Sequence, residues 1–186
     1  MTWPFGDLRP LSFACICADP PWSFENWSVK GEKKNAKSHY DCLPLGAIQD
    51  LPVGHLASRD AVLFLWCTWP MLREGIETME AWGFKYVSGG VWHKKTTHGK
   101  TAFGTGYRLR SASEPWLLGT LGNPKTSRAH RNVIEGAVRA HSQKPEEAYA
   151  WLETYVDGPW VELFSRTDRA GWSCWDCPHA APDGWW

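Results

Sequence analysis

The chain has 186 residues, of which 43% are hydrophobic and 22% charged, so it can build a folded core and global disorder is excluded. No apolar run approaches the roughly 20 residues that a membrane span needs, and residues 1–10 lack the apolar centre of a signal peptide. We therefore expect one domain over residues 1–186 in a soluble, cytoplasmic protein without a membrane partner.

The net charge is zero, but the charges are unevenly distributed. Between Lys85 and Lys144 there are 11 Lys or Arg residues and only two acids, Glu114 and Glu135, so this segment carries +9 and the remainder −9. Such a segment is typical of a surface that meets phosphates, although charge runs also occur on ordinary solvated loops. A nucleic acid is therefore the expected partner.

Apolar runs predict the first strands. Residues 13–18 (FACICA) form a short run that ends at two prolines, which predicts a buried, parallel strand with an abrupt stop. Residues 22–38 are polar and lysine-rich, as in a loop, and residues 44–51 fit a short helix. Residues 61–67 (AVLFLWC) predict a second buried strand.

The clearest helix is predicted to begin at Trp69-Pro70, with proline in its first turn, and to stop at Gly83. Its apolar residues fall on one helical face: Met71, Leu72, Ile76, Met79 and Trp82. Residues 86–92 predict a strand. Residues 93–110 hold three glycines among basic residues and predict a long mobile loop.

Strands and helices continue to alternate toward the C-terminus. The predicted order is a strand at 115–119, a basic loop at 122–131, a strand at 133–138, a helix from Lys144-Pro145 to about Val156, and a buried strand at 160–164. This alternation predicts an α/β fold with a mostly parallel sheet flanked by helices. Because ligands bind at the carboxyl ends of such strands, Asp19 and the residues after Phe164 are expected to line one site.

The run Asp19-Pro20-Pro21-Trp22 carries groups suited to an exocyclic amine of a base. The Asp19 carboxylate and the Pro20 carbonyl can accept hydrogen bonds from the two N–H groups of the adenine amine. These bonds localise the nitrogen lone pair for attack on a methyl group. Trp22 offers a flat face for a flipped-out base. The plainer alternative is a proline turn at a strand end, with Trp22 only packing.

An apolar strand, Asp-Pro-Pro-Trp and a lysine-rich loop together resemble the adenine amino methyltransferase family typified by the catalytic subunit of the messenger-RNA adenosine methyltransferase. Further blocks are similar to family blocks in family order: residues 61–68, 91–94, 106–124, 141–149 and 161–166, and Gly171-Trp172. The resemblance implies a Rossmann-like methyltransferase fold in a permuted order, with the catalytic block before the cofactor block. It also implies methylation of the N6 amino group of adenine by S-adenosylmethionine.

The resemblance assigns expected roles to particular residues. The catalytic set is Asp19, Pro20, Pro21 and Trp22. The set expected to bind S-adenosylmethionine is Asp19, Lys144, Arg166 and Asp168. The set expected to bind the nucleic acid is Tyr40, His93, Lys94, Lys95, Lys100, Arg108 and Arg110. Several have plainer alternatives: Lys144 as a helix-start lysine, Arg166 in a surface salt bridge, and Tyr40 or His93 in packing.

The chain departs from the family near its end. Where relatives have Gly-Asn-Gln or Gly-Asn-Glu, it has Asp176-Cys177-Pro178, so its adenosine contacts stay open. Its compactness resembles bacterial or phage members that act on DNA. An RNA substrate, or a nucleic-acid-binding subunit without catalysis, is the alternative, and a homodimer or a partner subunit stays open.

The cysteines do not predict a metal site. Cys174, Cys177 and His179 have part of a zinc-ligand spacing but lack a fourth ligand nearby, so we expect no metal. Cys15 and Cys17 lie in the apolar run and are expected to be buried thiols.

Overall fold

The computed structural model of the protein describes residues 3–22, 43–105, 108–139, 143–165 and 167–175. Seven strands form one sheet: β1 (Phe13–Ala18), β2 (Ala57–Trp66), β3 (Lys85–Lys95), β4 (Ser113–Leu121), β5 (Val133–Ala137), β6 (Trp160–Leu163) and β7 (Trp172–Trp175). The α-helices are α2 (Leu45–Gln49), α3 (Leu72–Ala81) and α4 (Glu146–Tyr155), and short 3₁₀ turns occupy Val53–His55 and Trp69–Met71.

The strands are ordered β5-β3-β4-β2-β1-β6-β7 across the sheet. β1 pairs in parallel with both β2 and β6, β6 pairs in parallel with β7, and β3 pairs in parallel with β5. Only β4 runs the other way, between β2 and β3. The sheet is therefore mostly parallel, as predicted, and the fold is Rossmann-like.

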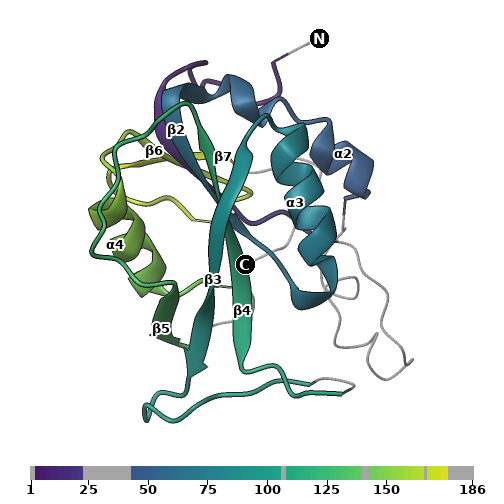
Figure 1. The fold of residues 1–186 in the computed structure, drawn as a ribbon, viewed down its shortest axis with the longest axis vertical. Coiled ribbons are helices and arrows are strands. Elements are labelled where there is room, and N and C mark those ends of the chain that lie inside the picture. Colours follow the sequence, from purple (N-terminus) through teal and green to yellow (C-terminus); the bar gives the residue numbers. More distant parts are fainter. Residues whose placement is uncertain (1–2, 23–42, 106–107, 140–142, 166, 176–186) are drawn as a thin grey trace.

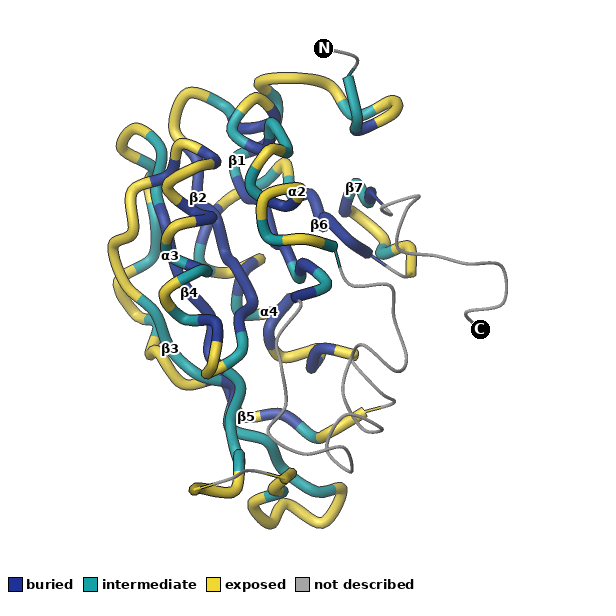
Figure 2. Tube along the Cα trace, turned by 90° about the vertical axis from the view of Figure 1, so that its right-hand side faces the viewer, coloured by how far each residue is buried: buried dark blue, intermediate teal, exposed yellow. Residues whose placement is uncertain are grey.

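Helices cover both faces of the sheet (Figure 1). One face carries α2 and α3 and the other carries α4, so β1 and β2 are buried on both sides (Figures 1 and 2). A strand buried on both faces needs apolar residues at successive positions, which explains the unbroken runs FACICA and AVLFLW.

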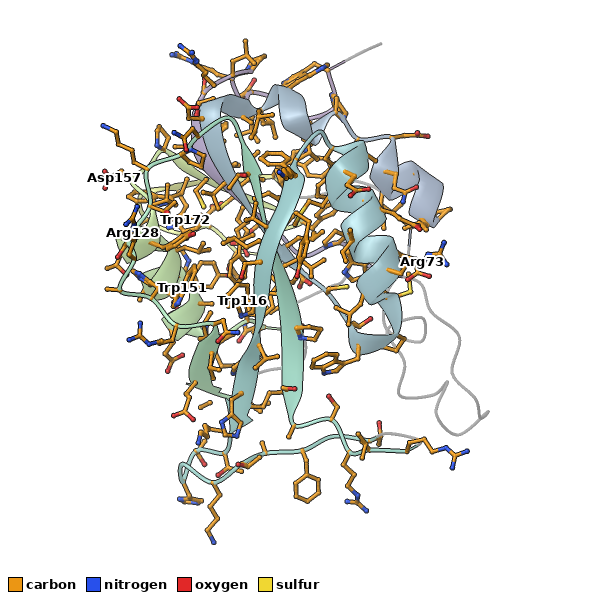
Figure 3. The ribbon with its side chains drawn as sticks, in the orientation of Figure 1. Arg73, Trp116, Arg128, Trp151, Asp157 and Trp172 are labelled. Atoms are coloured by element: carbon orange, nitrogen blue, oxygen red, sulfur yellow. The ribbon has the colours of Figure 1, made fainter. Side chains whose placement is uncertain are left out.

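The face under α4 is built largely from aromatic rings. The rings of Phe64 and Trp116 stack with centroids 4.8 Å apart, and Trp116 lies 5.3 Å from Trp151 of α4. Figure 3 shows Trp116, Trp151 and Trp172 on this side of the sheet, whereas Arg73 lies on α3 at the other side. Many of the chain's tryptophans are therefore core residues.

The predicted strands and helices are confirmed, with bounds shifted by a few residues. The predicted apolar stripe of α3 packs on the core with Met79 fully buried, and Gly83 follows the helix with φ of +85°, a left-handed conformation that favours glycine. Pro70 lies in the 3₁₀ turn just before α3.

One expectation needs correction, and one strand of the sheet is not predicted by the sequence. The sequence predicts a loop at residues 93–95, but they extend β3 because β5 supplies hydrogen-bonding partners for His93 to Lys95 that lie 42 residues along the chain. The sequence does not predict β7, because a strand of four residues is too short to show a clear pattern.

A single domain over residues 1–186 and a permuted block order stay predictions. None of the described helices is long and apolar enough to cross a membrane.

Candidate active site

The candidate site lies where the chain changes direction across the sheet. From β1 the chain continues to β2 on one side, whereas β6, on the other side of β1, continues to β7. Ligands of open α/β sheets bind outside the carboxyl ends of strands at such a switch point. Ala18 is paired with Leu163 there, and the Asp19 N–H lies 3.5 Å from the Leu163 carbonyl oxygen. Asp19 and the residues after Phe164 are thus neighbours, as expected.

The antiparallel strand β4 brings a second carboxylate to the same edge. Because β4 runs against its neighbours, its first residues lie beside the last residues of β3, with Trp92 opposite Glu114 and His93 opposite Ser113. Glu114 therefore lies at the edge that also holds Asp19, although 95 positions separate them in the sequence.

Lys144 joins the two carboxylates. Its Nζ lies 2.8 Å from Asp19 Oδ2 and 2.7 Å from Glu114 Oε1, and the other oxygen of Glu114 lies 2.8 Å from Lys94 Nζ. We call this row of Asp19, Lys144, Glu114 and Lys94 the charge relay, in that order. It connects the end of β1, the start of α4, the start of β4 and the end of β3.

Burial makes these ion pairs strong. The Lys144 side chain is 8% exposed, against 17% for Glu114 and 22% for Asp19. Burial by itself would raise the pKa of Glu114, but the charges of Lys144 and Lys94 outweigh it and lower that pKa to about 2. Burial would lower the pKa of Lys144, but Asp19 and Glu114 raise it above its usual value. Both groups therefore stay charged at neutral pH.

The side chains of Lys144 and Lys94 each pack over a tryptophan ring. Lys144 Nζ lies 5.2 Å from the centroid of the Trp66 ring, and Lys94 Nζ lies 4.9 Å from that of Trp92, distances typical of cation–π contacts. Both rings are buried. They exclude water from one side of the relay and so strengthen its electrostatics.

The turn after Asp19 is fixed by its own hydrogen bonds. The Trp22 N–H donates to the Pro20 carbonyl over 2.8 Å, and the Trp22 indole N–H donates to the Trp66 carbonyl over 3.0 Å. Trp22 is 4% exposed and part of the core under α3. This placement favours a role for Trp22 in holding the turn, whereas base stacking on Trp22 stays a prediction.

A second polar group lies beside the relay at the end of β6. Glu162 is buried, and its Oε1 accepts a hydrogen bond of 2.7 Å from the Tyr149 hydroxyl of α4, while its Oε2 lies 3.3 Å from the Ser165 hydroxyl. Burial, aided by the charge of Asp19, raises the pKa of Glu162. Next to it, Phe164 has φ of +62°, a strained conformation of the kind found at ligand sites.

Arg169 ties the segment after β6 to α4. Its guanidinium lies 3.5 Å from the centroid of the Tyr149 ring, and its Nη1 lies 2.7 Å from Glu146. Its Nε is buried and has no hydrogen-bond partner among the described residues. A buried donor without a partner is costly, so this atom is suited to an anionic group of a ligand.

The donor set fits S-adenosylmethionine. That molecule carries a sulfonium and an ammonium, which the carboxylates of Asp19 and Glu162 match, and a carboxylate, which the Arg169 guanidinium matches. All three side chains lie at or after the carboxyl ends of β1 and β6. Asp168, expected to meet the ribose, is exposed in the same segment, and Arg166 lies outside the described residues.

The expected nucleic-acid residues that the structure describes divide into three groups. Lys94 belongs to the charge relay. His93 and Lys95 alternate with Lys94 along β3, so they lie on the opposite face, where His93 Nδ1 and Lys95 Nζ lie 2.9 and 3.0 Å from Glu135 Oε1. The structure therefore does not bring His93 and Lys95 to the relay. Lys100, Arg108 and Arg110 are exposed on the connection from β3 to β4, and Tyr40 lies outside the described residues.

Four residues of the site are not singled out by the sequence: Glu114, Glu162, Tyr149 and Arg169. A signal exists for Glu114, which is one of only two acids in a segment with 11 bases. Tyr149 and Glu162 lie within blocks that resemble the family, but the sequence gives them no role, because they meet only through the packing of α4 on β6.

The described residues contain no group of three or more His, Cys, Asp or Glu that could hold a metal ion. Cys15 and Cys17 are buried, as predicted, and burial raises the pKa of both thiols above the usual value. Cys177 and His179, like residues 176–178 as a whole, lie outside the described residues.

Comparison with known proteins identifies the family of the chain. The MT-A70 family model matches residues 13–177. The chain is 33% identical over 171 residues to the N(6)-adenosine-methyltransferase MT-A70-like protein of Arabidopsis thaliana, and 31% identical over 179 residues to the N(6)-adenosine-methyltransferase catalytic subunit METTL3 of Homo sapiens. These alignments cover 87% and 88% of this chain but only 23% and 28% of the relatives, so the chain spans about a quarter of their length.

A shorter relative is similar over most of its own length. The type II methyltransferase M.MunI of Mycoplasma sp is 28% identical over 190 residues, which cover 92% of this chain and 79% of that protein. The family model covers nearly all of the chain, including every strand of the sheet. The protein therefore belongs to the MT-A70 family of adenine-N6 methyltransferases.

Proposed function

We propose that the protein transfers a methyl group from S-adenosylmethionine to the N6 amino group of adenine in nucleic acid, with DNA as the favoured substrate. The observation that carries this proposal is the position of Asp19. Its carboxylate lies at the switch point of the sheet and is held by Lys144 over 2.8 Å.

Asp19 is the group that acts on the target amine. Its carboxylate accepts a hydrogen bond from the amine and stabilises the positive charge that develops on nitrogen as the N–C bond forms. Lys144 donates to Oδ2 and thereby fixes the orientation of the carboxylate. The Pro20 carbonyl already accepts the Trp22 N–H and retains a second lone pair with which to accept the other N–H of the amine.

The cofactor would be held between the ends of β1 and β6. Glu162 and Asp19 would face its cationic groups, and Arg169 would face its carboxylate. When bound, S-adenosylmethionine supplies a methyl group on a sulfonium, and transfer to the amine yields S-adenosylhomocysteine, the methylated base and one proton. The mechanism needs no covalent link between enzyme and substrate.

The preference for DNA rests on the extent of similarity. The alignment spans 79% of the type II methyltransferase from Mycoplasma but only about a quarter of the plant and human adenosine methyltransferases. A substrate of the bacterial kind is therefore favoured over messenger RNA.

The test is to incubate the protein with methyl-labelled S-adenosylmethionine and, separately, single-stranded DNA, double-stranded DNA and RNA. Each nucleic acid is then digested to nucleosides and the labelled one identified by mass. Label on N6-methyldeoxyadenosine supports the proposal, and label on N6-methyladenosine keeps the reaction but moves the substrate to RNA. Cofactor binding without label on any substrate overturns the proposal for the isolated chain, and the absence of both favours a non-catalytic binding subunit.

A further inference from the structure

The described residues of the connection from β3 to β4, 96–105 and 108–112, form an arm that projects beyond the body of the sheet (Figures 1 and 2). It leaves from the same edge as Asp19, because the end of β3 and the start of β4 lie there. The arm has no acidic residue, and its Lys100, Arg108 and Arg110 are exposed. It is therefore a cationic projection beside the candidate site.

The arm is held in place by backbone hydrogen bonds. Lys94 anchors it from both sides, since its N–H donates to the Ala112 carbonyl over 3.0 Å and its carbonyl accepts the Ala102 N–H over 2.8 Å. Farther out, the Gly104 N–H donates to the Ser111 carbonyl over 2.7 Å. Gly99, with φ of +74°, closes a tight turn through a bond of 2.9 Å to the Thr96 carbonyl.

These hydrogen bonds present the Phe103 ring to solvent. Phe103 lies between Ala102 and Gly104, the two residues whose N–H groups hold the arm together, and its side chain is 61% exposed. The Arg110 guanidinium lies over the ring at 5.3 Å from the centroid. An exposed phenylalanine costs hydrophobic free energy, so a ring that is fixed in place and capped by a cation is suited to stacking on a flat partner.

We propose that Phe103, backed by Arg110, stacks on an unpaired base next to the target adenine and so holds the strand in register. The inference rests on the proposed function and adds a residue that reads position along the strand. A base is the favoured partner because the ring lies against the Arg110 guanidinium on an arm without acidic residues. Positive charge attracts phosphates, and aromatic faces accept any base. Lys94 connects the arm to the site. Its backbone anchors the arm, and its side chain is the last member of the charge relay, so the arm is held at a fixed distance from Asp19.

The experiment compares Phe103→Ala with three matched variants: Phe103→Trp, Leu109→Ala and Arg110→Ala. Leu109 is the apolar control, because it lies on the same arm and is 85% exposed but cannot stack. The probe is a single-stranded oligodeoxynucleotide with 2-aminopurine beside one adenine. Its affinity, its fluorescence quenching and the salt dependence of binding are measured, together with methyl transfer by the wild type and Phe103→Ala.

Stacking predicts that Phe103→Ala weakens binding roughly 5- to 150-fold, removes the quenching and leaves the salt slope unchanged. Phe103→Trp restores both signals, and Leu109→Ala binds within about twofold of the wild type. Arg110→Ala lowers the slope of log affinity against log salt by about 1, the value for one lost phosphate contact. Equal binding and quenching by Phe103→Ala and wild type would overturn the inference, as would equal losses in Phe103→Ala and Leu109→Ala.

The two proposals can fail separately. If the wild type binds and quenches the probe through Phe103 but transfers no methyl group, the stacking surface is supported and the proposed reaction is not. If the wild type methylates adenine and Phe103→Ala does so with unchanged KM, the reaction stands and the stacking surface is overturned.

Discussion

At the scale of single residues, the site depends on one cation held between two anions. Lys144 contacts Asp19 and Glu114 at once and lies over the Trp66 ring. An ion pair out of water is stable only when each charge keeps its partners, so no member can change without an effect on the others. The contribution of each member is therefore best separated by conservative substitutions.

Asp19→Asn is expected to lower the turnover number roughly 100- to 1000-fold, the usual loss when one preorganised electrostatic group is removed from a reaction centre. The amide keeps the shape of the carboxylate but not its charge. The affinity for S-adenosylmethionine, measured by calorimetry, is expected to change much less. A turnover number near that of the wild type would refute the role of Asp19.

Lys144→Met is expected to lower the free energy of unfolding by about 2–4 kcal/mol, below the full cost of a broken buried pair because both carboxylates are partly exposed. The change leaves Asp19 and Glu114 close together without a cation between them. Urea unfolding followed by tryptophan fluorescence measures the loss. The double variant Lys144→Met/Glu114→Gln is expected to recover part of it, and no recovery would argue against repulsion between the carboxylates as the cause.

At the scale of elements, the direction of β4 decides the composition of the site. A parallel strand in its place would carry Glu114 to the far edge of the sheet, away from Asp19. The same reversal makes the connection from β3 to β4 emerge at the site edge, so the basic arm and the relay share one side of the molecule. The charge-rich segment between Lys85 and Lys144 is thereby divided into bases that pair with Glu114 or Glu135 and bases on the exposed arm.

That division predicts different salt effects for two sets of basic residues. Replacing Lys100, Arg108 and Arg110 together with glutamine is expected to reduce the slope of log affinity against log salt by about 2 to 3, through lost phosphate contacts. Replacing Lys95, which lies 3.0 Å from Glu135, with glutamine is expected to leave the slope nearly unchanged. Fluorescence anisotropy with labelled DNA at several salt concentrations gives both slopes. Equal effects per charge would contradict the division.

At the scale of the whole molecule, the relay links the stability of the fold to pH. The relay joins the ends of β1, β3 and β4 to the start of α4. A change in its ionisation therefore affects contacts across most of the sheet. Since Glu114 has a pKa of about 2 when folded and about 4.5 otherwise, the folded state favours its charged form. The ionised Glu114 therefore adds to the free energy of unfolding above about pH 4.5, and this addition is lost as the pH falls toward 2.

Protonation of Glu114 by acid is therefore expected to lower the free energy of unfolding by on the order of 3 kcal/mol. The measurement is the difference in unfolding free energy between wild type and Glu114→Gln across this pH range, which cancels the titration of other groups, including the opposing one of Glu162. The difference should narrow as pH falls. Glu77→Gln is the control, because Glu77 is exposed in a surface pair with Arg73. A constant difference would mean that Glu114 is not held ionised by the two lysines.

The sequence by itself determined most of the elements and the place of Asp19 at the end of a strand. Runs such as FACICA can only be satisfied by burial on both faces, and the prolines after Asp19 end the strand wherever it packs. The family resemblance likewise rests on residues that are contiguous in the chain. The amino-acid pattern alone therefore places Asp19 at a strand end and next to the residues that follow β6.

Only the tertiary structure decided which charged side chains belong to the site. Lys94 and Lys95 are adjacent in sequence, yet the pleat of β3 turns one toward Glu114 and the other toward Glu135. Glu162 is a site residue only because Tyr149 of α4 packs over β6, and Arg169 joins it only through that same helix. These contacts depend on strand direction, register and helix packing, which are set by the burial of the whole core and not by any local run of residues.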